Sequence, residues 1–228
     1  FFKLGYQLYK KDKTLLQSYA RQFGLGSKTG IDLNNEAKGL VPDPEWRKNY
    51  FDKRSNQIWY PGYTINLSIG QGNLRASPIQ ISSLINSVAN GGQLYQPLLV
   101  DKIVDPQGKV VKNIRAKSYN KIPVSSQHLD IIKEGLNGVT TYGTAKRIFS
   151  DLEVTTAGKT GTAQTGGNRP NHGWFAGFAP VENPEISIVV FIEYGNSSSN
   201  TLPVARDIIK KYFNAGTEEK AGKEADNS

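Results

Sequence analysis

Three β-rich runs in the second half of the chain are the feature that most constrains how it can fold. They cover residues 154–165, 172–179 and 185–195, and short turns join them, the second through Glu182-Asn183-Pro184. Runs rich in β-branched and aromatic residues that end at turn residues are typical of neighbouring strands. Because the connections are short, the sequence predicts antiparallel pairing of the three strands.

Helical patterns precede and follow these runs. The clearest start is Ser77, which can cap a helix whose first residue is Pro78 and whose Gln80 completes a capping box. Glycines at 91 and 92 end that helix. Further helices are predicted over residues 1–24, from Ser125 or Ser126 through Leu136, and over 202–213, and a hairpin over 94–111 with its turn at 105–108. The pattern predicts an α+β fold, an antiparallel sheet with helices packed on its faces.

Residues 34–63 show neither the hydrophobic period of a helix nor that of a strand. The segment is rich in proline, aromatic residues and charge, and a loop of this length in a compact domain is usually functional or disordered. One interpretation is a lid or rim over a groove. The other is a loop packed down by its own aromatic side chains, which are Trp46, Tyr50, Phe51, Trp59 and Tyr60. The sequence leaves both interpretations open.

Composition excludes several classes of function. The 228 residues include no cysteine and two histidines, so disulfides and a structural zinc site are not expected, and no cofactor is implied. The formal net charge of +8 invites a nucleic-acid interpretation. However, the basic residues are dispersed and interleaved with acids, which favours a solvated surface and no nucleic-acid partner. The chain has no apolar run of about 18 residues, so it offers no membrane span.

The run Ala157–Gln164 places a lysine, two threonines and two glycines on a predicted strand. Gly158 and Gly161 remove side chains where the backbone of a ligand could lie close. A phosphate-binding loop would need a further glycine at position 153, which is Glu153, a carboxylate that repels phosphate. The run therefore suits an extended peptide that pairs with the strand better than it suits a nucleotide.

The Lys159-Thr160-Gly161 strand resembles that of the penicillin-recognising serine acyltransferases. The resemblance extends to segments that are typical of class B penicillin-binding proteins, the elongation-type peptidoglycan D,D-transpeptidases: 29–33, 59–66, 69–72, 77–80, 172–180 and 185–194. It covers residues 1–213 and implies a β-lactamase-like fold, here incomplete at the N-terminus. Residues 1–213 would be the C-terminal part of a transpeptidase domain, and residues 214–228, poor in apolar side chains, are expected to be a disordered tail.

The resemblance also implies roles for residues of the strand. Lys159 would help proton transfer and hold the electrostatics of the site. Thr160 and Thr162 would contact the substrate carboxylate, the main-chain amide of Thr162 would be one oxyanion donor, and Gly161 and Gln164 would line the same groove. An oxyanion donor contributes about 3 kcal/mol of transition-state stabilisation. Without the resemblance, Lys159 would be read as a surface lysine whose stem covers apolar residues.

The nucleophile that the family requires is not found in its place. Ser118-Tyr119-Asn120-Lys121 has the Ser-x-x-Lys spacing, but it lies in a loop and does not open a helix. Ser198-Ser199-Asn200 has the spacing of the Ser-x-Asn triplet, but it follows Lys159 and suits turn chemistry. We interpret both as chance matches and expect the nucleophile and the triplet upstream of Phe1. His172 is interpreted as a structural residue, with general-base catalysis as its alternative.

The function that the resemblance implies is crosslinking of peptidoglycan stem peptides through a serine acyl-enzyme that β-lactams also form. Expected partners are stem peptides, β-lactam antibiotics, a membrane glycosyltransferase and elongation-complex proteins. The expected location is the extracytoplasmic, periplasmic face of a bacterial cell membrane, with the membrane anchor outside this segment. A non-catalytic peptide or β-lactam sensor on the same scaffold is an alternative, and a β-lactamase relative ranks last, because no deacylating base is evident.

Overall fold

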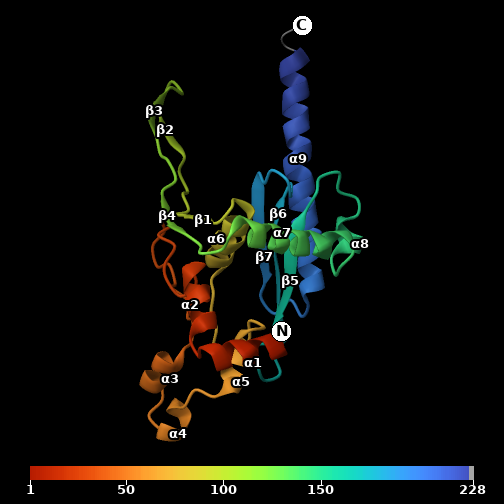
Figure 1. Cartoon of the computed structure of the whole chain (residues 1–228). Helices are drawn as coiled ribbons and strands as arrows, with labels where there is room; N and C mark the ends of the chain where they lie inside the picture. The colour runs from red at the N-terminus through yellow and green to blue at the C-terminus, as the bar shows by residue number, and fades with distance from the viewer. Residues whose placement is uncertain (226–228) are drawn as a thin grey trace. The chain divides into compact units, whose positions relative to one another are not determined.

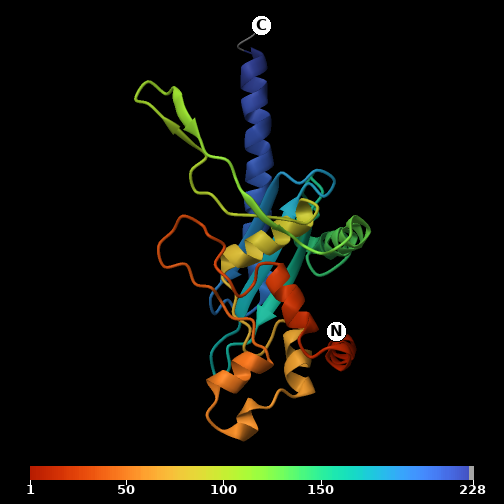
Figure 2. The ribbon, with the colours of Figure 1, turned by 60° about the vertical axis from the view of Figure 1, so that its left-hand side comes forward.

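The computed structural model describes the backbone of residues 1–225 and the side chains of residues 1–214. The described chain divides into two compact units. The first contains residues 1–87 and 92–124, and the second contains residues 88–91 and 125–228. Each unit is described by itself below. Figures 1 and 2 show the elements of both.

The first unit is mainly helical. Its helices are α1 (Phe2–Lys11), α2 (Leu15–Gln22), α3 (Pro44–Tyr50), α4 (Arg54–Gln57), α5 (Pro61–Leu67) and α6 (Pro78–Ala89), of which residues 88 and 89 belong to the second unit. Its strands are β1 (Gln93–Tyr95), β2 (Lys102–Val104), β3 (Val110–Asn113) and β4 (Ser118–Lys121), which form two separate antiparallel ribbons, β1–β4 and β2–β3. The hairpin predicted over 94–111 is therefore wrong for residues 94–95, which pair with β4 instead. Its turn at 105–108 is confirmed.

Side-chain caps explain two boundaries in this unit. The single helix predicted over 1–24 is broken, because the carboxylate of Asp12 accepts hydrogen bonds from the amide and the hydroxyl of Thr14, at 2.7 and 2.8 Å. The capping box of α6 is confirmed: the Ser77 amide donates to Gln80 Oε1 and the Gln80 amide to Ser77 Oγ. Gln80 is fully buried and also donates to the carbonyls of Ser27 and Lys38. It therefore holds the loops around residues 27 and 38.

The segment 34–63 contains short helices and is anchored by a buried arginine. Arg47 is 7% exposed and lies between the rings of Phe51 and Tyr63, at 4.6 and 3.9 Å from their centroids. It donates hydrogen bonds to the carbonyl of Ile58 and to the hydroxyl of Tyr63. Trp59 is buried as well, whereas Tyr50 and Tyr60 are exposed. Packing around Arg47 thus accounts for the defined conformation of a segment whose sequence has no helical or strand periodicity.

The second unit contains the predicted sheet. Strands β5 (Ala157–Ala163), β6 (His172–Ala179) and β7 (Ile186–Ile192) pair antiparallel, which confirms the predicted pairing, and their order in the sheet is β5-β6-β7. The helices are α7 (Ser126–Thr141), capped by Ser125, α8 (Lys146–Phe149) and α9 (Leu202–Ala225), which follows the 3-10 helix η1 (Ser198–Thr201). An antiparallel sheet flanked by helices confirms the α+β class (Figure 1).

One face of this sheet carries the core. Phe175 and Val190 are ladder partners on β6 and β7, and both are buried against Phe149 of α8 and Leu202 and Ile209 of α9. Burial of such large apolar side chains contributes about 1.5–3 kcal/mol each. This packing explains why the terminal helix begins where its apolar residues meet the sheet.

Helix α9 is longer than predicted. The sequence predicts a helix over 202–213, but the helical backbone continues to Ala225, and residues 226–228 lie outside the described part. The added turns are rich in alanine, glutamate and lysine, which are strong helix formers and need no apolar contact to take a helical backbone. The expectation of a tail without apolar packing concerns side chains that the structure does not describe.

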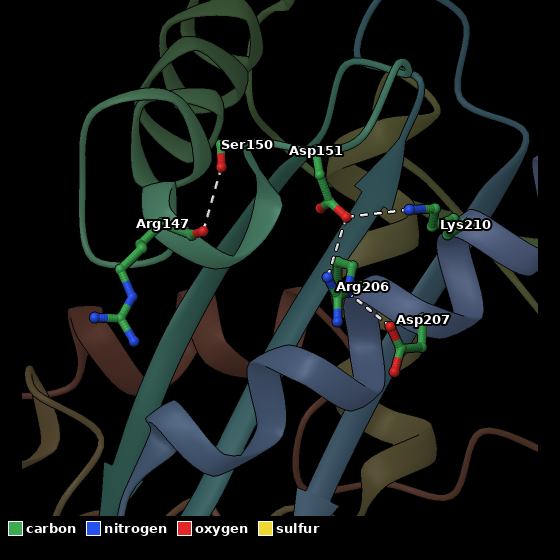
Figure 3. A network of polar contacts seen from close by, with 6 residues as sticks. All are labelled: Arg147, Ser150, Asp151, Arg206, Asp207 and Lys210. Carbon is green, nitrogen blue, oxygen red and sulfur yellow. Dashed lines mark hydrogen bonds and ion pairs between the residues drawn. The ribbon is translucent and has the colours of Figure 1, made fainter.

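Ion pairs connect α9 to the loop before β5. The carboxylate of Asp151 lies 3.1 Å from Arg206 and 3.1 Å from Lys210, one turn apart on α9 (Figure 3). Arg206 also contacts Asp207 on its own helix. A hydrogen bond from Lys210, together with the charges of Lys210 and Arg206, lowers the pKa of Asp151. The loop is thereby tied to the outer surface of the helix.

Candidate functional site

Strand β5 lies at an edge of its sheet, and the predicted site residues follow one another along it. Among the described residues, β5 has a strand neighbour on one side only, where Lys159 pairs with Ala176, Thr160 with Phe175 and Thr162 with Gly173. The amide and carbonyl groups on its outer side can therefore pair with an extended peptide. Lys159 to Ala163 are exposed or half-buried, so this edge is accessible.

Lysine and threonine side chains leave the strand on opposite faces. Partners in a ladder share a face, so Thr160 and Thr162 lie on the face of Phe175, and Lys159 on the face of Ala176. The Lys159 ammonium donates to the carbonyl of Thr160, at 2.7 Å. Lys159 is exposed, and an ammonium beside a strand edge can attract a carboxylate or exchange a proton with a neighbouring hydroxyl.

The two threonine hydroxyls are held by different elements. Thr160 Oγ1 lies 3.2 Å from the hydroxyl of Thr144, in the turn that follows α7. Thr162 Oγ1 accepts a hydrogen bond from the amide of Ser198, at the start of η1. The sequence around Thr144 has no local signal for a contact with residue 160, so Thr144 is not predicted as a site residue. The sequence predicts Ser198 only as part of a turn.

Gly158 and Gly161 differ in what a side chain at each position would contact. A Cβ at Gly158 would clash with the buried ring of Phe175, so packing alone requires glycine there. A Cβ at Gly161 would meet only Trp174 Cβ, at an ordinary 3.5 Å. The expectation that both glycines make room for a ligand is therefore corrected for Gly158. For Gly161 it remains a prediction.

Gln164 and His172 are the remaining candidates from the sequence. Gln164 follows the last residue of β5 and is exposed. His172 accepts the amide hydrogen of Tyr194 at Nδ1, 3.0 Å away, and its ring packs against Phe191 and Tyr194. Such a histidine is satisfied by structural contacts, which agrees with its structural interpretation.

Local structure accounts for the matches to the Ser-x-x-Lys motif and to the Ser-x-Asn triplet. The loop predicted around Ser118 is wrong, because Ser118 and Lys121 both lie on strand β4; they therefore do not share the one-turn spacing of a helix. The Ser118 hydroxyl donates to Gln93 Oε1, across the β1–β4 ribbon. Ser198 opens η1, a turn whose preceding residue, Ser197, accepts a hydrogen bond from the amide of Ser199. Neither serine is arranged as an activated nucleophile.

Among residues 1–214, whose side chains the structure describes, no group of three or more histidine, cysteine, aspartate or glutamate side chains could hold a metal ion. Over the described backbone, residues 1–225, no helix is both long and apolar enough to cross a membrane. The site consists of an accessible strand edge, a lysine and two positioned hydroxyls. Chemically, this set can bind an extended peptide and stabilise a carboxylate or an oxyanion.

Sequence comparisons agree on the class of protein that this chain is similar to. The family described as "Penicillin binding protein transpeptidase domain" matches residues 1–212. The peptidoglycan D,D-transpeptidase MrdA of Acinetobacter baumannii is 34% identical over 209 residues, which are 85% of this chain. MrdA of Haemophilus influenzae is 30% identical over 220 residues, which are 87% of this chain. The chain spans about a third of the length of these relatives, 30% and 32%.

A comparison with solved structures gives a similar fold. The chain matches the penicillin-binding protein PBP2 of Helicobacter pylori, solved in complex with MreC, with a TM-score of 0.78 and 28% identity. The match covers 95% of this chain and 38% of that one. The arrangement of strands and helices described above is thus that of known penicillin-binding proteins.

Proposed function

Because this chain belongs to the penicillin-binding protein transpeptidase domain family, we propose that it is part of an elongation-type peptidoglycan D,D-transpeptidase. Residues 1–213 would be the C-terminal part of the transpeptidase domain. The observation that carries the proposal is the exposed edge of β5, where Lys159, Thr160 and Thr162 stand on a strand that has a neighbour on one side only. A D-Ala-D-Ala stem would pair with this edge as an added strand.

In the proposed reaction each residue of the strand has a distinct task. The amide of Thr162 donates to the oxyanion of the tetrahedral intermediate, while the hydroxyls of Thr160 and Thr162 bind the terminal carboxylate of the stem. Lys159 supplies positive charge and helps proton transfer at the serine. Gly161 and Gln164 line the groove. The contacts of Thr144 with Thr160 and of Ser198 with Thr162 support these roles, because they fix the side chains before the substrate arrives.

The serine nucleophile would lie in another part of the longer protein. The curated relatives have room for it, since this chain spans about a third of their length. Attack of that serine on the stem would release D-alanine and leave an acyl-enzyme, which an amine of a second stem would then resolve. A β-lactam would acylate the same serine.

Partners and location follow as part of the proposal. The match to a PBP2 that was solved in complex with MreC supports partners from the elongation complex. A membrane glycosyltransferase would be a further partner, and the site would face the extracytoplasmic side of the bacterial membrane. The anchor would belong to the longer protein.

Covalent labelling tests the proposal. The longer protein that contains this chain is treated with a fluorescent penicillin, and its intact mass and labelled peptide are determined. We expect one adduct on a serine outside residues 1–228. In Lys159→Ala the labelling rate should fall by at least about 100-fold, as expected for loss of an acid–base group. Lys146→Ala, an exposed lysine of α8, is the matched control. An adduct on a serine within residues 1–228 would contradict the proposal.

Turnover of a substrate distinguishes a transpeptidase from the alternative, a non-catalytic sensor. A transpeptidase releases D-alanine from a stem-peptide donor when an amine acceptor is present, and a sensor binds the donor or the β-lactam without releasing it. Chromatographic detection of D-alanine with the unmodified longer protein therefore decides between the two. Absence of release from a protein that still binds penicillin would favour the sensor.

A further inference from the structure

The β2–β3 hairpin is an exposed ribbon that the proposed reaction does not use. Strands β2 and β3 pair through Lys102–Asn113, Ile103–Lys112 and Val104–Val110, and all seven of their residues are exposed. Figures 1 and 2 both show the hairpin projecting away from the rest of its unit. Among the described residues no third strand joins it, so both of its outer edges carry unpaired amide and carbonyl groups.

The hairpin exposes more apolar surface than a solvated ribbon needs. Ile103, Val104 and Val110 are each close to half exposed, and Val111 is 67% exposed. A two-stranded hairpin without further packing is at best marginally stable in water. Apolar residues of this size on an exposed edge mark a surface that gains from a partner.

Charge indicates what kind of partner fits. Residues 101–117 contain five lysines and arginines but two acidic residues, Asp101 and Asp105. Asp105 belongs to the turn, where its carboxylate accepts the amide hydrogens of Gln107 and Lys109. Lys102 and Lys112 stand on different strands and are exposed. A partner with acidic side chains would complement this charge.

We propose that this hairpin binds an extended, acidic segment of a partner protein, which adds to it as a third β-strand. The register of the ladder shifts between Ile103 and Val104, where Ile103 pairs with Lys112 and Val104 with Val110. Consecutive residues of a strand point to opposite faces, so the two pairs place apolar surface on both faces of the ribbon. A strand at the edge packs its own alternating side chains beside both faces and also pairs the free backbone groups.

Two other occupants fit less well. A lipid surface would cover one face of the ribbon only, and the tip that would enter it, residues 105–108, is Asp-Pro-Gln-Gly, without a large apolar side chain. A second copy of the hairpin would bring Lys102 or Lys112 against like charges, which disfavours self-pairing. The same lysines, which lie on opposite faces of the ribbon, favour a strand with glutamate or aspartate on both of its faces.

The test uses a peptide of about eight residues in which Val-Val and Glu-Glu pairs alternate as the probe, since such a strand places both valine and glutamate on each of its faces. Hydrogen exchange of the full chain is measured by mass spectrometry with and without the peptide. We expect slower exchange in residues 102–113 at low salt. The double variant Lys102→Glu/Lys112→Glu should bind the peptide at least about tenfold more weakly, because charge repulsion replaces attraction.

The control is the double variant Lys11→Glu/Lys48→Glu, which makes the same charge change on α1 and α3 and should bind the peptide as the unaltered chain does. Equal binding by the hairpin and control variants would overturn the proposal. It would also be overturned if the peptide leaves exchange at 102–113 unchanged while phosphatidylglycerol vesicles slow it, or while a higher protein concentration slows it. Those two results would point to a lipid surface and to self-association, respectively.

Discussion

The hydroxyl oxygens of Thr144 and Thr160 lie 3.2 Å apart, although the two residues belong to different elements of the second unit. Thr144 stands in the turn between α7 and α8, and Thr160 is the central residue of the Lys-Thr-Gly run on β5. The contact restrains the side chain that we propose to bind the substrate carboxylate. Its orientation is therefore set by a residue outside the strand.

Removing this partner should weaken acylation without unfolding the protein. In the longer protein, Thr144→Val is expected to lower the rate constant for penicillin acylation by about twofold to tenfold, the value of one neutral hydrogen bond. Thr144→Ser, which keeps the hydroxyl, should restore the rate. The same change at Thr141, whose hydroxyl donates to a carbonyl within α7, is the control and should leave the rate unchanged. Equal rates in Thr144→Val and the unaltered protein would show that the contact has no role.

The two glycines of β5 should respond differently to a methyl group. Gly158→Ala places Cβ into the Phe175 ring, which is fully buried and cannot move aside, so we expect a loss of about 1–3 kcal/mol of unfolding free energy. Gly161→Ala meets only an ordinary contact and should keep the stability. Urea unfolding of both variants measures the difference. If Gly161→Ala lost as much stability as Gly158→Ala, the packing explanation would be wrong.

Sequence reasoning succeeded where the signal is local. The sequence predicts strands β5, β6 and β7, the cap Ser77 and a cap at Ser125 or Ser126, of which the structure shows Ser125, because alternation, turn residues and capping patterns lie within a few residues of one another. The order of site residues along β5 was equally plain from the sequence.

Long-range pairing was not predictable in the same way. Residues 94 and 120 pair in the β1–β4 ribbon, and residues 144 and 160 share a hydrogen bond, but no pattern in the intervening sequence specifies either contact. The reason for Gly158 depends on the position of Phe175, which only the packing of the sheet reveals. The break at Asp12 has a local signal, since aspartate two residues before threonine favours a turn.

The ion pairs of Asp151 should make the folding stability of the chain depend on pH. Because the hydrogen bond from Lys210 and the nearby charges lower the pKa of Asp151, its contribution is complete above the unfolded pKa, near 3.9, and is lost as the pH falls through the lowered folded pKa. The midpoint of thermal unfolding should therefore fall more steeply below about pH 4 in the unaltered chain than in Asp151→Asn.

The control for this comparison is Asp130→Asn on α7, which should follow the unaltered chain. Since Asp151 is on the surface, the difference between the curves should shrink in about 1 M salt, where the Debye length is about 3 Å. Parallel curves for Asp151→Asn and the unaltered chain at low salt would rule out this contribution.

Lysine should not be able to replace arginine at position 47. Its guanidinium stacks between Phe51 and Tyr63 while it donates to Ile58 and Tyr63, and lysine cannot reproduce a planar group with several directed donors. We expect Arg47→Lys to cost about 2–3 kcal/mol of unfolding free energy, because a buried ammonium would lose both the stacking and a hydrogen bond. Urea denaturation gives this value, and Arg54→Lys on the exposed helix α4 should change it by less than about 0.5 kcal/mol. Equal stability of the two variants would mean that the charge alone, and not the planar geometry, holds the segment 34–63 in place.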